Sequence, residues 1–173
     1  LKLVNVCGAC LVVFFQSKTV RMMSNSIMAE IFYLLLTLLN VPLIFYTSFI
    51  YGEILSVACF TGGIYFWLLY EKKAKSVGYL FLSVFFLTAG VVFRKNSLIF
   101  VIAVVCVAFV CFIRNKNYMY LLYIVLLLFG ACGVLPLIQG IYEWRAQNTL
   151  LEGVPAISFI AMGMQESVTG NGF

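Results

Sequence analysis

Two apolar runs separated by a short polar break decide the fold: VGYLFLSVFFLTAGVVF (residues 77–93), then Arg94-Lys95-Asn96, then SLIFVIAVVCVAFVCFI (residues 97–113). A chain inside lipid must bond all of its backbone N–H and C=O groups internally, so runs of this kind fold as α-helices. A helix of about 20 apolar residues crosses the hydrocarbon of a bilayer. The stretch therefore predicts two membrane helices joined by a tight reversal.

The composition of the whole chain also indicates that lipid, and not water, surrounds most of it. Of its 173 residues, 64% are hydrophobic and 10% are charged, and the mean hydropathy is +1.10. A soluble domain carries about 25% charged residues, because it must cover itself with polar surface. We therefore expect an all-α, polytopic bundle of transmembrane helices with lipid against most of its surface.

Six segments reach or approach the length of a spanning helix, and we predict five or six spans. We expect residues 1–138 to form the transmembrane core and residues 139–173 to form an extracytoplasmic loop with an amphipathic, interfacial helix. The chain begins with Leu1 instead of Met and stops in a polar stretch, so we expect it to be an internal piece of a longer protein. The six segments are residues 3–15, 27–46, 54–70, 77–93, 97–113 and 118–138.

The basic residues between these segments predict an orientation. Loops 16–26, 71–76 and 114–117 carry seven Lys and Arg residues, whereas loops 47–53 and 94–96 carry two. Cytoplasmic loops are the ones enriched in Lys and Arg. We therefore expect the first set to be cytoplasmic in a multi-pass protein of the plasma membrane. The net charge of +5 then reflects topology, with membrane lipid as a partner and no nucleic acid.

Several kinds of chemistry are not supported by the residues present. The chain contains no Asp and no His, which excludes a His-based triad and a His-ligated metal within it and leaves Glu as the general base. There is no phosphate-binding GxxxxGK[ST] motif for nucleotide hydrolysis. The Cys7-Gly8-Ala9-Cys10 spacing is that of a zinc or redox motif, but it lies in an apolar run and favours packing. We predict no metal site and no cofactor.

The sequence Tyr51-Gly52-Glu53 is the first candidate site, because a carboxylate at the mouth of an apolar helix is costly unless a polar cavity or a cation receives it. The alternative is an interfacial Glu53 at a helix N-terminus, where the helix dipole favours negative charge.

The break Arg94-Lys95-Asn96 is the second candidate site. If the two helices end below the outer surface, Arg94 or Lys95 would lie in a protein-lined cavity, where a guanidinium can hold a phosphate with paired hydrogen bonds. Alternatively, both cations extend to lipid head groups.

Three stretches resemble the membrane core of bacterial glycosyltransferases similar to protein O-mannosyltransferases. They are FYTSFIYGEILS (residues 45–56), AGVVFRKNSLI (residues 89–99), and a tail made of GVPAISFIAMGM (residues 153–164) and GNGF (residues 170–173). The resemblance implies the GT-C architecture and transfer of a sugar from a polyprenyl-phosphate carrier to an acceptor at the extracytoplasmic face. It also implies a catalytic acid that would precede Leu1.

On this interpretation the substrate-binding candidates are Tyr51, Glu53, Arg94, Lys95 and Asn96, with the lipid-linked sugar as donor and an unknown acceptor. A cation would stabilise the departing phosphate in an inverting transfer.

Other classes of membrane protein remain open. A transporter or lipid flippase would use interrupted helices, and Gly62-Gly63 and Pro136 are expected to interrupt helices here. A polysaccharide polymerase or a non-catalytic scaffold has the same hydropathy.

Overall fold

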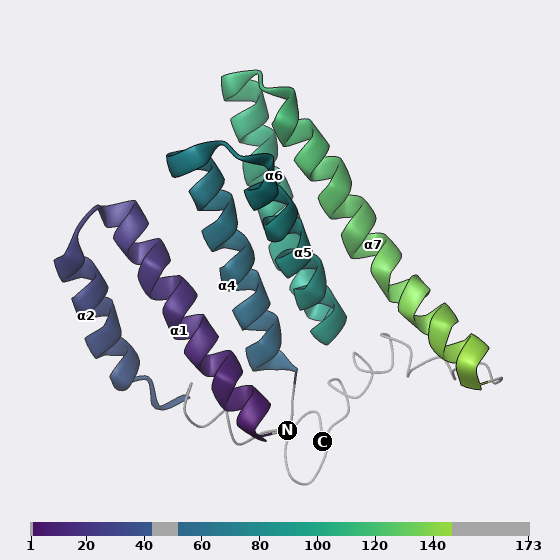
Figure 1. The fold of residues 1–173 in the computed structure, drawn as a ribbon, viewed down its shortest axis with the longest axis horizontal. Coiled ribbons are helices and arrows are strands. Elements are labelled where there is room, and N and C mark those ends of the chain that lie inside the picture. The colour runs from purple at the N-terminus through teal and green to yellow at the C-terminus, as the bar shows by residue number, and fades with distance from the viewer. Residues whose placement is uncertain (1, 43–51, 147–173) are drawn as a thin grey trace, which may run out of the picture. The chain divides into compact units, whose positions relative to one another are not determined.

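The computed structural model describes residues 2–42 and 52–146, which are nearly all helical and include no β-strand (Figure 1). The all-α prediction is therefore confirmed for the described residues. The elements are α1 (Lys2–Ser24), α2 (Ile27–Leu38), α4 (Glu53–Leu69), the π-helical turn η1 (Tyr70–Ala74), α5 (Val77–Phe93), the 3₁₀ turn η2 (Lys95–Ser97), α6 (Leu98–Asn115) and α7 (Tyr118–Ala146).

Four of the described helical stretches are long and apolar enough to cross a membrane: Lys2–Ser24, Glu53–Lys72, Lys95–Asn115 and Tyr118–Arg145. The apolar helices Ile27–Leu38 and Val77–Phe93 are shorter. Four of the six predicted segments thus have the length of a span, and the total of five or six spans stays a prediction. Residues 43–46, the predicted end of the second segment, lie outside the described residues.

The first helix is longer than predicted. Residues 16–24, expected to belong to a loop, continue α1 to Ser24. Their polar side chains indicated a loop, yet Lys18 and Arg21 pair with Glu30 of α2, and Gln16 accepts a hydrogen bond from Tyr33. Polar residues are compatible with a helix here because the neighbouring helix supplies their partners.

The expected helix breaks at Gly62-Gly63 and Pro136 are wrong. Both lie inside continuous helices, α4 and α7. A Cβ atom at Gly63 would lie 2.6 Å from Cγ of Leu87 on α5, and one at Gly62 would lie 2.9 Å from the Phe86 ring. The glycine pair therefore lets α4 approach α5 closely, as small residues do between membrane helices. Proline is tolerated in membrane helices when other groups satisfy the freed carbonyl.

Polar bonds cross the buried interior of the bundle. Ser83 of α5 donates a hydrogen bond to the Gly63 carbonyl oxygen of α4 at 2.8 Å. Its hydroxyl proton is then committed, so the Tyr123 hydroxyl of α7, 2.8 Å away, donates to Ser83. Both side chains are fully buried, so the two bonds link three helices inside the bundle. The surrounding apolar core comprises Tyr70, Leu80, Leu87, Val91, Val101, Val104, Ala108, Tyr120, Tyr123, Leu127 and Ala131.

Consecutive helices run in opposite directions, so their connections gather at two ends (Figure 1). The turn between α1 and α2, the η1 turn and the turn between α6 and α7 lie at one end. The start of α4 and the η2 turn lie at the other end. The three basic connections are thus together, as the predicted orientation requires.

The chain divides into two units, Leu1–Leu135 and Pro136–Phe173. Of the second unit, the structure describes only residues 136–146, which form the last part of α7. The sequence places the boundary at residues 138 and 139. Residues 147–173, most of the predicted extracytoplasmic loop, lie outside the described residues, and the outer placement stays a prediction.

Candidate functional site

The end of α5 and the beginning of α4 approach each other at Gly52. A Cβ atom at this position would lie 2.7 Å from the carbonyl oxygen of Phe93, the last residue of α5. That separation is too short for a carbon atom and a backbone oxygen, so the position requires glycine. The approach brings Glu53, the first residue of α4, beside Arg94, which follows α5.

Glu53 and Arg94 form an ion pair between Oε1 and Nη1. The side chain of Glu53 is 30% exposed and that of Arg94 is 42% exposed. The carboxylate also lies in the first turn of α4, where the helix dipole favours an anion. Both proposed environments of Glu53, a helix N-terminus and a neighbouring cation, are therefore present together.

A pocket of about 460 Å³ opens beside this ion pair. One part of its wall is polar and the other is apolar, a combination that suits an amphiphilic ligand with a charged group and a hydrocarbon chain. The polar lining residues are Glu53, Ser56, Arg94, Asn96 and Ser97, and the apolar ones are Val57, Ile99 and Phe100.

Two buried serines hold the pocket wall together. Ser56 of α4 donates a hydrogen bond to the Gly90 carbonyl oxygen of α5 at 2.9 Å. The Ser97 hydroxyl also contacts the Ser56 hydroxyl, and Ser97 is the donor because the Ser56 proton is already used. These bonds connect α4, α5 and η2, and in a buried setting they fix the relative positions of Glu53 and Arg94.

An aromatic contact holds the apolar wall. The rings of Phe60 on α4 and Phe100 on α6 lie 4.4 Å apart between centroids and are tilted by 31°. Aromatic pairs at this separation add attraction beyond the area they bury. The first turn of α6, which carries Ile99 and Phe100, is thereby fixed against α4.

The structure brings together three of the five candidates named from the sequence: Glu53, Arg94 and Asn96. Lys95 is exposed and is not among the described residues that line the pocket. Tyr51 lies outside the described residues.

Sequence reasoning missed Ser56 and Ser97, and both had a usable signal. Ser56 follows Glu53 by three positions, so the two share a helix face. Ser97 directly follows the polar break at residues 94–96.

Metal-binding groups are not assembled in the described part of the chain. Within residues 2–42 and 52–146, no three His, Cys, Asp or Glu side chains are placed to hold a metal ion. Cys7 and Cys10 are exposed free thiols on α1.

The chain matches no protein-family model, no curated protein and no solved structure. Its class is therefore defined by its own fold: a helical protein with four described helices long and apolar enough to span a membrane. The pocket beside Glu53 and Arg94 is the feature from which a function is argued below.

Proposed function

We propose that this chain is part of a multi-pass plasma-membrane glycosyltransferase of the GT-C type, which moves a sugar from a polyprenyl-phosphate carrier to an acceptor at the extracytoplasmic face. The observation that carries the proposal is Arg94, a partly exposed cation on the wall of an amphiphilic pocket at a helix end.

Arg94 would bind the phosphate of the donor. As the sugar leaves, negative charge develops on the carrier phosphate, and a guanidinium held in position stabilises that charge. A guanidinium presents several N–H donors in a planar fork that matches phosphate oxygens. The contact with Glu53 engages Nη1, so other donors of the fork remain for a ligand.

The apolar wall would receive the polyprenyl chain. Ile99 and Phe100 are both exposed on the first turn of α6, and Val57 of α4 also lines the pocket. Such side chains face hydrocarbon in a membrane, so a lipid-linked donor could enter from the bilayer with its phosphate directed to Arg94. This route suits a carrier that never leaves the membrane.

Glu53 would keep Arg94 in place before the donor binds. An ion pair with a nearby carboxylate holds the guanidinium at the pocket, and the donor phosphate then shares or replaces that partner. We assign Glu53 this positioning role and not that of the catalytic base.

The competing proposal of a transporter or flippase loses its main sequence argument. It depended on interrupted helices, and α4 and α7 continue through Gly62-Gly63 and Pro136. A polysaccharide polymerase would differ from the proposed transferase in using a lipid-linked acceptor. The identity of the acceptor therefore separates the two.

The test is turnover of polyprenyl-phosphate hexoses by the purified protein carrying Arg94→Ala, Arg94→Lys or the control Arg114→Ala. Loss of a transition-state charge partner costs about 100-fold in rate or more. We expect that loss for Arg94→Ala and an intermediate rate for Arg94→Lys, which keeps the charge without the fork. Arg114 lies at the opposite end of the bundle, so its variant should turn over normally. An Arg94→Ala variant with unchanged turnover would remove the basis of the proposal.

A further inference from the structure

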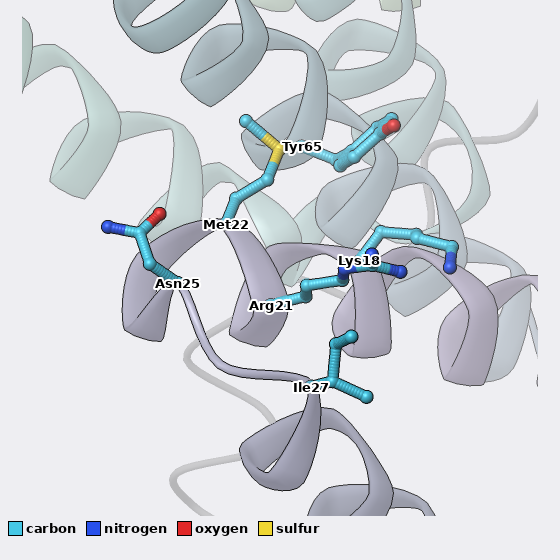
Figure 2. Close-up of a pocket in the computed structure, with 6 residues that line it drawn as sticks. All are labelled: Lys18, Arg21, Met22, Asn25, Ile27 and Tyr65. Carbon is cyan, nitrogen blue, oxygen red and sulfur yellow. The ribbon is translucent and has the colours of Figure 1, made fainter.

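A second pocket, of about 560 Å³, lies beside the turn between α1 and α2 (Figure 2). This turn is at the end of the bundle opposite to the start of α4 and the η2 turn (Figure 1). Figure 2 shows Lys18 and Arg21 on neighbouring turns of α1, Ile27 at the first position of α2, and Tyr65 reaching in from α4. The proposed sugar transfer makes no use of this pocket. Its lining residues are Lys18, Arg21, Met22, Asn25, Ile27 and Tyr65.

The charge around this pocket is predominantly positive. Lys18 Nζ lies 2.8 Å from Oε1 of Glu30, and Arg21 Nη1 lies 3.3 Å from Oε2 of the same carboxylate. A third cation, Lys72, donates a hydrogen bond to the carbonyl oxygen of Met22. Lys18 and Arg21 therefore share the one carboxylate of Glu30, which leaves this group with a net positive charge that an anion would balance.

The side chains of the two cations are accessible to solvent, whereas that of Glu30 is nearly buried. The side chain of Glu30 is 10% exposed, whereas those of Lys18 and Arg21 are 37% and 50% exposed. Glu30 thus fixes both cations from behind and leaves donors of each directed toward solvent. Glu30 positions both cations but also occupies some of their N–H donors, so a bound anion would compete with this carboxylate.

The turn between α1 and α2 holds the site rigidly. Asn25 adopts a left-handed backbone conformation (φ 52°), which Asn tolerates better than most residues. Ser24 donates to the Val20 carbonyl oxygen at 2.8 Å and accepts a hydrogen bond from the Ser26 N–H at 3.3 Å.

We propose that this pocket binds the headgroup phosphate of an anionic phospholipid of the cytoplasmic leaflet. Basic pockets between membrane helices on the cytoplasmic side are suited to such head groups. The lining also includes the apolar side chains of Met22 and Ile27 and the ring of Tyr65, which would contact the glycerol and the upper acyl chains. This amphiphilic lining favours a lipid over free phosphate. The inference is independent of sugar transfer, since lipid binding is measured without turnover.

The test uses protein equilibrated in bilayer discs of equimolar phosphatidylglycerol and phosphatidylcholine, with the ratio of retained lipids read by native mass spectrometry. One unit of charge close to an anionic headgroup changes binding about fivefold. Lys18→Gln/Arg21→Gln/Glu30→Gln removes two cations and their buried partner, so no carboxylate is left unpaired. We expect its phosphatidylglycerol preference to fall about fivefold or more. The control Arg114→Gln/Lys116→Gln, at another basic turn of the same end, should keep the preference of the unmodified protein.

A second variant separates a lipid site from a clamp that only joins α1 to α2. Glu30→Gln releases both cations, so it should raise phosphatidylglycerol retention by about fivefold. A clamp without a ligand would give no rise, and that result would overturn the proposal. Inorganic phosphate, added at constant ionic strength, should leave the retained phosphatidylglycerol unchanged. Displacement by inorganic phosphate, or equal retention by the triple variant and the control, would likewise overturn it.

Discussion

Arg94, one residue beyond the end of α5, forms an ion pair with Glu53, the first residue of α4. The pair joins the two helix ends at the place where Gly52 already allows close approach. Below it, Ser56 and Ser97 link the same elements through buried hydrogen bonds. The structural connection and the charged contact are thus carried by different residues, and mutations can separate them.

Arg94→Ala should lower stability only slightly. Both partners are partly exposed, and ion pairs of this kind contribute about 1 kcal/mol or less. We expect the thermal midpoint of the purified protein to stay close to that of the unmodified chain, and the same for Glu53→Gln. Thermal unfolding followed by circular dichroism in detergent measures this. Unfolding of Arg94→Ala at a much lower temperature would mean that any loss of turnover reflects a lost fold.

Ser83→Ala should destabilise the bundle more than Tyr123→Phe. The first change leaves the Tyr123 hydroxyl buried without the partner it has in the structure, which costs about 1–3 kcal/mol. The second leaves Ser83 bonded to the Gly63 carbonyl oxygen and costs about 0.6 kcal/mol, the average for hydrogen bonds between membrane helices. Unfolding in sodium dodecyl sulfate gives both values. The opposite order would contradict the assignment of Ser83 as the residue that bonds both Gly63 and Tyr123.

Gly63→Ala should destabilise the contact between α4 and α5. The new methyl group would lie 2.6 Å from Cγ of the buried Leu87, and overpacking of this kind costs about 1–3 kcal/mol. Gly133→Ala is the matched control on α7, because a Cβ atom there meets no atom within 4 Å. It should be neutral or slightly stabilising, since Ala favours a helix over Gly. Equal stability of the two variants would show that α4 and α5 do not pack as described.

Hydropathy predicted the helices well where the runs are uniformly apolar. Val77–Phe93 has the predicted bounds, and α6 begins one residue after the predicted start. Hydropathy failed at residues 16–24, because it treats polar side chains as loop signals and does not detect a partner such as Glu30 on the next helix.

The sequence predicted individual residues of the candidate site but not the contacts between them. Unusual charges in apolar surroundings identified Glu53 and Arg94, since each carries its signal in its own neighbourhood. Their pairing depends on the close approach of α4 and α5, and the burial of Ser56 and Ser97 depends on the same packing. Such properties arise from contacts between segments and are not encoded in any one of them.

Both proposals depend on the orientation of the bundle in the membrane. The end that carries Arg94 must face outward, and the end that carries Lys18 must face the cytoplasm. The direct measurement is labelling of intact cells with a membrane-impermeant maleimide, after replacement of the six native cysteines. We predict that a protein carrying Lys95→Cys is labelled in intact cells and that one carrying Lys116→Cys is labelled only after permeabilisation. Labelling of Lys116→Cys in intact cells, with Lys95→Cys protected until permeabilisation, would contradict the orientation and both sites assigned from it.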